Sequence, residues 1–287
     1  MMNERKITLT LLDVYKDYLI RDEKSKATIS KYLHDVRVFA EFAQDRPIDK
    51  NLVLEYKDIL GEAYSVSSAN SMLAALNSFF RFMNWRDAEV KRFKVQKQVY
   101  CKAENELTKD EYLRLVAAAE QKSKRLSLVI QTLCGLGMRV SELSYITVEA
   151  VECGEAVVSC KGKTRVIFIV SSLRKKLLKY AKKEGISQGA IFITRSGNPL
   201  DRSNIWREMK MICKDACVRE TKVFPHNLRH LFARTFYTME KDITKLADVL
   251  GHSNINTTRI YIVTSGAEHL RQLEKMHLIP LEENFTT

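Results

Sequence analysis

The segment Pro225-His226-Asn227-Leu228-Arg229-His230 decides how this sequence is interpreted. Proline suits the first turn of a helix, because it lacks an N–H that this turn would leave unpaired. His226 and Arg229, three residues apart, would then project from the same face of that helix. The two histidines have the i, i+4 spacing of a zinc hydrolase, but that motif requires a glutamate where this chain has Asn227. The pattern therefore favours a histidine–arginine pair and argues against a metal site.

Three further candidate functional residues lie on either side of this segment. Arg139 directly follows a glycine turn at Gly137, where a helix is predicted to begin. His252 follows Gly251, which is predicted to end another helix, and Tyr261 lies nine residues beyond that histidine. Taken alone, Arg139 is more typical of a surface ion pair, and Tyr261, one of 11 tyrosines, is more typical of a packing residue.

Taken together and in this order, these segments resemble the tyrosine site-specific recombinases of the phage integrase family, especially their Xer-like branch. The resemblance extends over essentially the whole chain. It is carried by four blocks: Arg-Val-Ser-Glu-Leu from Arg139, His-Asn-Leu-Arg-His-x-Phe-Ala from His226, Leu-Gly-His-Ser-x-Ile-x-Thr-Thr from Leu250, and Ile-Tyr ending at Tyr261.

The resemblance implies an enzyme that cleaves and rejoins DNA through a 3′-phosphotyrosyl intermediate, for integration, excision, inversion or dimer resolution. Tyr261 would be the nucleophile and His226 its general base, since a phenol loses its proton unaided only near about pH 10. Arg139 and Arg229 would hydrogen-bond the non-bridging phosphate oxygens, a role that suits a permanently charged guanidinium. His252 would hydrogen-bond the same phosphate.

A catalytic lysine, which would protonate the leaving 5′ oxygen, is implied in a β-hairpin. Two β-rich runs, 156–160 and 165–170, flank the predicted turn Lys161-Gly162-Lys163-Thr164. The Xer-like pattern Lys-Gly-x-Lys-x-Arg is one residue longer than this chain's turn. Lys161 and Lys163 are therefore both candidates, and the register from the first strand favours Lys161.

The remaining sequence predicts a mainly α-helical protein in two domains. Residues 1–90 carry apolar side chains at helical spacing, and the resemblance implies a helical, SAM-like core-binding domain that clamps DNA. Residues 106–287 are predicted to form an α+β catalytic domain that contains the small hairpin. A capping box at Thr108 and Glu111 marks its first helix.

The connector, residues 91–105, is predicted to be a basic linker. Its cations are Lys91, Arg92, Lys94, Lys97 and Lys102. They could form a solvated surface or a strip that follows DNA phosphates.

The C-terminal segment is predicted to form a helix over 267–278 with an apolar stripe. That stripe could pack on its own domain, or dock on a neighbouring protomer as in the family. The family implies a homotetramer, or an assembly with a related recombinase, on two double-stranded DNA molecules with inverted half-sites.

The composition agrees with a DNA-binding protein. The chain has 47 Lys and Arg against 35 Asp and Glu, a formal net charge of +12, which favours a polyanionic partner. Neither an apolar run of about 20 residues nor a signal sequence is found, which predicts a cytoplasmic protein without a membrane partner. The chain lacks a phosphate-binding glycine loop and metal-binding cysteine spacing, so neither ATP, a metal nor another cofactor is expected.

Two other functions remain open at this point. A type IB topoisomerase-like enzyme would use a similar Arg, Lys, Arg, His, Tyr set to relax supercoiled DNA. A catalytically silent DNA-binding accessory factor would share the fold, but here every expected catalytic position is filled.

Overall fold

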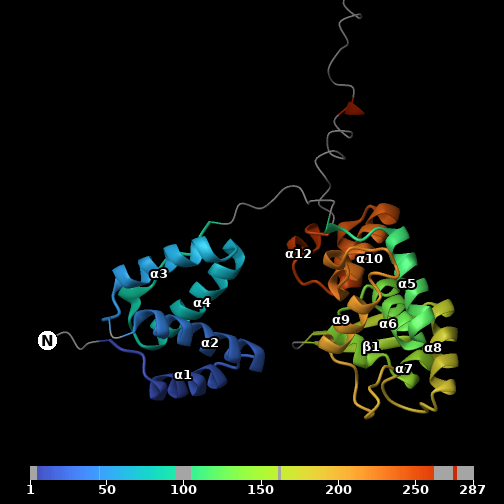
Figure 1. The fold of residues 1–287 in the computed structure, drawn as a ribbon, viewed down its shortest axis with the longest axis horizontal. Coiled ribbons are helices and arrows are strands. Elements are labelled where there is room, and N and C mark those ends of the chain that lie inside the picture. The colour runs from blue at the N-terminus through green and yellow to red at the C-terminus, as the bar shows by residue number, and fades with distance from the viewer. Residues whose placement is uncertain (1–4, 45, 95–104, 161–162, 262–273, 277–287) are drawn as a thin grey trace, which may run out of the picture. The chain divides into compact units, whose positions relative to one another are not determined.

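The computed structural model describes residues 5–44, 46–94, 105–160, 163–261 and 274–276. The chain divides into two compact units, Met1–Lys97 and Gln98–Thr287 (Figure 1). The described residues are mainly helical with one small antiparallel hairpin, which confirms the predicted fold class. None of the described helices is long and apolar enough to cross a bilayer.

The N-terminal unit is a helical bundle. The apolar side chains predicted at helical spacing over residues 1–90 form the buried faces of four α-helices. In order, its elements are α1 (Leu9–Arg21), α2 (Lys26–Ala43), α3 (Lys50–Ala63), α4 (Val66–Phe82) and the short 3-10 turn η1 (Arg86–Ala88). An N-cap side chain accepts a hydrogen bond from the first turn of each α-helix; the caps are Thr8, Ser25, Asp49 and Ser65.

Aromatic side chains fill the core of this bundle. Tyr15 packs edge-on against Phe79, with ring centroids 5.1 Å apart, and Phe39 packs edge-on against Phe80 at 5.8 Å. All four rings are fully buried. Such pairs add to the hydrophobic effect of burying large side chains, so the unit has its own core.

The C-terminal unit is built around α6, which packs against α5, α8, α9 and α10 (Figure 1). Its first helix begins with the predicted capping box at Thr108 and Glu111. The helices are α5 (Lys109–Lys122), α6 (Lys124–Gly135), α7 (Val148–Cys153), α8 (Ser171–Lys183), α9 (Arg202–Met211), α10 (Pro225–Glu240), α11 (Ile243–Leu250) and α12 (Ile255–Arg259), with 3-10 turns η3 (Val140–Tyr145) and η4 (Glu220–Lys222).

The hairpin consists of β1 (Glu155–Cys160) and β2 (Lys163–Phe168), paired with Cys160 opposite Lys163. Assignment of Lys163 and Thr164 to the turn was therefore wrong. The antiparallel pairing extends through both residues, and Thr164, a β-branched residue that suits a strand, lies opposite Ser159.

Several predicted features lie partly or wholly outside the described residues. In the connector, Lys91, Arg92 and Lys94 are exposed, as both interpretations of the basic strip require, whereas Lys97 and Lys102 lie outside the described part. The predicted helix over 267–278 also lies outside it, apart from residues 274–276.

Candidate active site

Helix α10 begins at Pro225, as predicted, and buries Arg229 to 1% exposure. The guanidinium donates hydrogen bonds to the carbonyl oxygens of Gly137 and Leu250, each at 2.7 Å. It also contacts the Nε2 atom of His252 at 2.9 Å. Arg229 therefore joins the turn before Arg139 to the end of α11, so two of the segments singled out in the sequence meet at one side chain. Burial lowers the pKa of Arg229 to about 10, so it stays charged at neutral pH.

The tautomer of His252 follows from this contact. A guanidinium only donates hydrogen bonds, so Nε2 must accept. The proton then resides on Nδ1, which lies 2.9 Å from the Oγ1 atom of buried Thr258 and donates to it. Burial, assisted by the charge of Arg229, lowers the pKa of His252 to about 4, so the ring is neutral at pH 7.

Tyr261 follows Ile260, the C-cap residue of α12, and is 3% exposed. Its ring stacks on that of His252 at a centroid distance of 5.6 Å and meets that of His230 edge-on at 4.4 Å. The ring of His226, an exposed residue, is 5.9 Å away. Although His226 is exposed to solvent on one side, desolvation by the surrounding protein and the charges of Arg229 and Arg139 lower its pKa, which favours the neutral imidazole that a general base requires.

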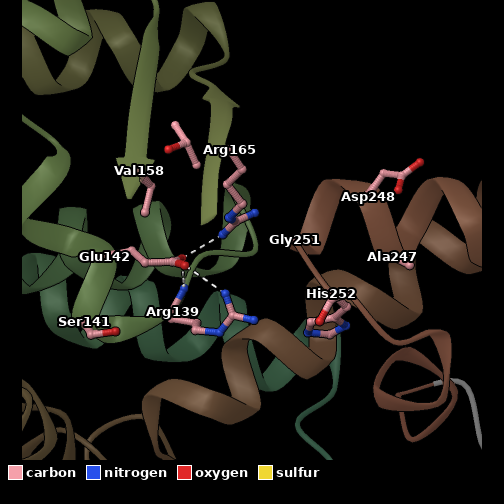
Figure 2. Close-up of a pocket in the computed structure, with 11 residues that line it drawn as sticks. Arg139, Ser141, Glu142, Val158, Arg165, Ala247, Asp248, Gly251 and His252 are labelled. Atoms are coloured by element: carbon pink, nitrogen blue, oxygen red, sulfur yellow. Dashed lines mark hydrogen bonds and ion pairs between the residues drawn. The ribbon is translucent and has the colours of Figure 1, made fainter. Parts of the chain in front are cut away.

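Arg139 is fixed by Glu142, a residue that the sequence analysis did not single out (Figure 2). Buried Glu142 accepts a hydrogen bond from the Arg139 guanidinium at 2.9 Å and another from the Arg139 backbone N–H at 2.7 Å. Burial acts to raise the pKa of Glu142, but the Arg139 N–H and the Arg165 charge outweigh it, so the pKa lies below its usual value. The arginine is the N-cap residue of η3, so the helix that was predicted to begin here is a short 3-10 helix.

Arg165 is a second residue that was missed. It projects from β2 and donates at 2.7 Å to the Glu142 oxygen that also accepts the Arg139 backbone N–H. It also hydrogen-bonds the carbonyl oxygen of Val249 in α11. The hairpin is thus tied both to the Arg139 turn and to the helix that precedes His252. The signal was available, because Glu142 belongs to the Arg-Val-Ser-Glu-Leu block and Arg165 ends the hairpin pattern.

Two glycines allow these close approaches. Gly137 has φ +58°, and a Cβ atom there would lie 2.3 Å from the ring of Phe232. Gly251 has φ +65°, and its Cβ would lie 2.4 Å from the Cδ atom of Arg165. Both positions combine left-handed backbone with insufficient space, so a larger residue would displace the elements that carry Arg139 and His252.

A pocket of about 680 Å³ opens between these elements, and Arg139, Arg165 and His252 are among its lining residues (Figure 2). Arg139 keeps 36% of its side chain exposed. The pocket therefore offers the accessible guanidinium of Arg139 beside the less exposed one of Arg165, which is an arrangement suited to a phosphate group.

The hairpin lysines are not placed by the structure. Lys161 lies outside the described residues, and for Lys163 only the backbone, in β2, is described. In the part of the chain that is described, no cluster of three or more His, Cys, Asp or Glu side chains could hold a metal ion.

The free energy of unfolding is expected to fall as the pH drops from 7 to 5. Burial is the main reason that the pKa values of His230 and His252 are lowered to about 4, whereas unfolded histidines titrate at about 6.5. The unfolded state therefore binds more protons in this window. The contribution is present above pH 6.5 and is lost as the pH falls towards 4, by roughly 1–2 kcal/mol per histidine at pH 5.

Urea unfolding at both pH values measures this loss. In the His230→Phe variant the ring contacts remain but one titrating group is absent, so the contribution of that histidine, roughly 1–2 kcal/mol, should disappear. An unfolding free energy that is equal at pH 7 and pH 5 would contradict the prediction.

The helical N-terminal unit, the hairpin and the convergence of arginines, histidines and a tyrosine define the tyrosine recombinase class of DNA strand-exchange enzymes. The chain belongs to the phage integrase family. Residues 105–267 match the model of that family, and residues 12–87 match the model described as the phage integrase N-terminal SAM-like domain.

Curated relatives extend this similarity over the full chain. Tyrosine recombinase XerA of Pyrococcus horikoshii is 30% identical over 288 residues, which cover 97% of this chain and 98% of the relative. Tyrosine recombinase XerA of Thermococcus kodakarensis is 31% identical over 278 residues, covering 94% and 96%. The resemblance to the Xer-like branch is thereby confirmed.

Solved structures share the fold. XerH recombinase bound to its difH substrate superposes with a TM-score of 0.69 at 19% identity, covering 92% of this chain and 84% of that one. A lambda integrase tetramer bound to a Holliday junction gives a TM-score of 0.72 at 20% identity, covering 90% and 78%. At these identities the likeness concerns the fold alone.

Proposed function

We propose that this chain is a site-specific DNA recombinase that cleaves and rejoins DNA through a 3′-phosphotyrosyl intermediate. The observation that carries the proposal is the convergence of Tyr261, Arg229 and His252 with Arg139 and His226 around one pocket and one helix. These residues come from three parts of the chain that are distant in sequence, around residue 139, around residues 226–229 and in residues 252–261. Packing alone does not require such a set of groups to meet.

In the proposed cleavage step the Tyr261 oxygen attacks the phosphorus and its proton passes to His226. The bond to the 5′ oxygen breaks, and a hairpin lysine, Lys161 or Lys163, protonates that oxygen. Religation reverses these steps with a 5′ hydroxyl of the partner duplex. Because the phosphotyrosyl bond retains the energy of the broken bond, the proposed reaction requires neither ATP nor a metal. Tyr261 is 3% exposed without DNA, so its hydroxyl must become accessible when DNA binds.

The two arginines take different parts in this proposal. Arg139, which is partly exposed at the pocket, can hydrogen-bond a non-bridging oxygen directly. Arg229, which is buried and contacts the pocket residue His252, contributes positive potential there, and the low dielectric strengthens its effect. It also holds His252, whose Nε2 atom can donate to the phosphate only if it releases Arg229 and carries a proton.

The proposed partner is double-stranded DNA with inverted half-sites, bound by a homotetramer on two duplexes. XerH has been solved on its DNA substrate, and lambda integrase as a dimer on a core site and as a tetramer on a Holliday junction. In this chain we assign residues 1–90 to DNA clamping, 91–105 to a basic connector and 106–287 to catalysis. The exposed cations Lys91, Arg92 and Lys94 would follow phosphates, together with Lys97 and Lys102.

Covalent capture tests this function. Full-length protein is incubated with a pool of nicked duplexes that carry random inverted arms around a short spacer, and DNA that remains attached after denaturation is sequenced. The expected result is a set of inverted half-sites linked to protein through their 3′ ends. Absence of any attached DNA would overturn the proposal.

A second measurement separates recombination from DNA relaxation. Two labelled duplexes that carry the captured site should yield recombinant products with exchanged flanks. Relaxation of supercoiled DNA without exchanged flanks would instead identify a topoisomerase-like enzyme. Binding without either reaction would identify a silent DNA-binding factor.

A further inference from the structure

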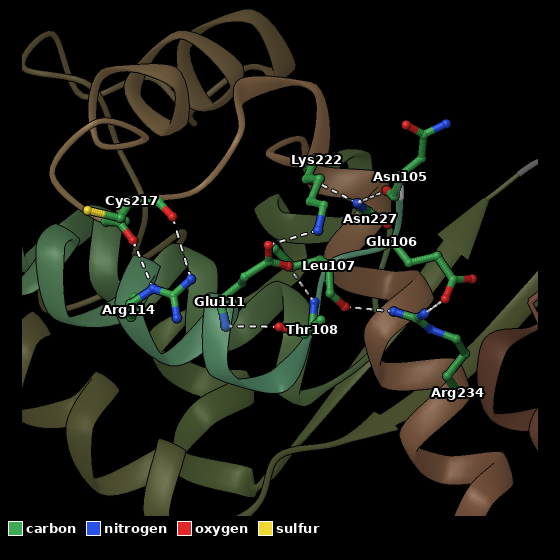
Figure 3. A network of polar contacts seen from close by, with 11 residues as sticks. Asn105, Glu106, Leu107, Thr108, Glu111, Arg114, Cys217, Lys222, Asn227 and Arg234 are labelled. Carbon is green, nitrogen blue, oxygen red and sulfur yellow. Dashed lines mark hydrogen bonds and ion pairs between the residues drawn. The ribbon is translucent and has the colours of Figure 1, made fainter. Parts of the chain in front are cut away.

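Helix α10 holds the first described residues of the C-terminal unit through two of its side chains (Figure 3). The Asn227 amide donates to the carbonyl oxygens of Asn105, at 3.0 Å, and Lys222, at 2.7 Å. Arg234, two turns further along the same helix, donates to the carbonyl oxygen of Leu107 at 2.7 Å and pairs with Glu106. We call Asn227, Arg234 and residues 105–107 the α10 clip.

The lysine that the clip contacts is itself held in place. Lys222 is buried, and its ammonium donates to Glu111 of α5 at 2.8 Å. The same carboxylate accepts the Thr108 backbone N–H at 2.8 Å in the capping box (Figure 3). Asn227 therefore connects the first turn of α10 to two backbone segments that are fixed by α5.

His226 depends on this connection more than Arg229 does. Phe224, the N-cap residue of α10, provides no side-chain hydrogen bond to the first turn, in which His226 lies. Among the described residues, the His226 imidazole has ring contacts with His230 and Tyr261 but no hydrogen bond. Arg229, in contrast, is held by three polar contacts of its own.

We propose that Asn227 is a positioning residue, which fixes the first turn of α10 and so sets where the His226 imidazole lies relative to Tyr261. Asn227 is 4% exposed and its amide donates to both carbonyl oxygens, so removing the amide leaves the carbonyl oxygen of buried Lys222 without this donor and frees the exposed residue Asn105. This inference rests on the proposed function, in which His226 is the general base. It gives a role to the side chain that stands where a zinc hydrolase would have glutamate.

Single-turnover cleavage of the captured nicked duplex tests the proposal. With protein saturating the DNA, Asn227→Ala should cleave about tenfold or more slowly than wild type, because misplacing a general base costs a large part of its effect. DNA affinity should change less than threefold. Without DNA, the ring resonances of His226, assigned with His226→Gln, should shift in the NMR spectrum of Asn227→Ala.

Asn77→Ala is the matched control. Asn77 is 8% exposed and also makes two hydrogen bonds with backbone, to the carbonyl oxygen and the N–H of Val90 in the N-terminal unit. It should lose comparable stability, yet keep the His226 resonances and cleave bound DNA within twofold of wild type. If Asn227→Ala cleaves as fast as Asn77→Ala, or leaves the His226 resonances unshifted, the positioning role is overturned while the recombinase assignment stands.

A second pair of variants covers the case in which Asn227→Ala does not fold. Arg234→Gln releases the other half of the clip, and Arg125→Gln removes an equivalent arginine that donates to the carbonyl oxygen of Ile193 and pairs with Glu208. Arg234→Gln should cleave at least about threefold more slowly than Arg125→Gln. Equal rates would overturn the proposal. Failure of the wild type to form any covalent product would overturn the proposed function, and this inference with it.

Discussion

Replacement of Tyr261 by phenylalanine is expected to lower covalent cleavage of DNA by about 1,000-fold or more, because it removes the oxygen that would bond to phosphorus. The phenyl ring can keep the contacts with His230 and His252 that hold the tyrosine ring in place. The free energy of unfolding should therefore change by less than about 1 kcal/mol, and DNA affinity should stay within about threefold of wild type. Denaturing gel electrophoresis of protein and nicked duplex measures the covalent product.

Tyr237→Phe is the matched control for this substitution. Tyr237 packs against the same apolar cluster as Tyr261, formed with Ala233, Leu246 and Leu250. The Tyr237→Phe substitution removes one phenolic hydroxyl next to the same apolar cluster. Cleavage should remain within about twofold of wild type. Covalent product that persists in Tyr261→Phe, or disappears in Tyr237→Phe, would assign the nucleophile elsewhere.

Short-range patterns predicted the elements that carry the candidate site. Pro225 marks the beginning of α10, Gly251 the end of α11, and Thr108 with Glu111 the beginning of α5, and the structure has each of these. Helix beginnings and ends of this kind depend on the backbone preferences of single residues. They can therefore be predicted without knowledge of the tertiary fold.

Long-range contacts could not be predicted in this way. Glu142, which holds Arg139, meets Arg165 from 23 residues away, and Arg229 reaches carbonyl oxygens 92 and 21 residues away. No local preference encodes such pairs, because they depend on how the hairpin, α10 and α11 pack together. The tautomer of His252 is similarly a property of the packed site, since it follows from the donor that meets its Nε2 atom.

At the turn of the hairpin, the family motif does not identify the catalytic lysine. Resemblance implied a catalytic lysine but could not choose between Lys161 and Lys163 once the turn was one residue short. The pairing of Cys160 with Lys163 places the second lysine at the beginning of β2, where side chains alternate between the two faces of the sheet. Lys161→Ala and Lys163→Ala, compared in the capture assay, would identify the proton donor.

Exchange of Arg229 for lysine is the second substitution with a large expected effect, although it preserves the charge. A lysine ammonium is a compact donor without the planar fork of a guanidinium. It cannot reach the Gly137 and Leu250 carbonyl oxygens and His252 together, and two buried acceptors would lose their partner. We expect the free energy of unfolding to fall by about 3 kcal/mol and cleavage by about 100-fold or more.

Arg114→Lys is the matched control, because it makes the same arginine-to-lysine exchange outside the candidate site. Arg114 donates to the carbonyl oxygens of Ala216 and Cys217, but it is exposed and is not among the residues of the pocket. Its replacement should change the unfolding free energy by less than about 1 kcal/mol and leave cleavage intact. If Arg229→Lys were as active and as stable as Arg114→Lys, charge alone would suffice at position 229. The fork that joins the Arg139 turn to the His252 turn would then have no part in catalysis, which contradicts the geometry proposed for the site.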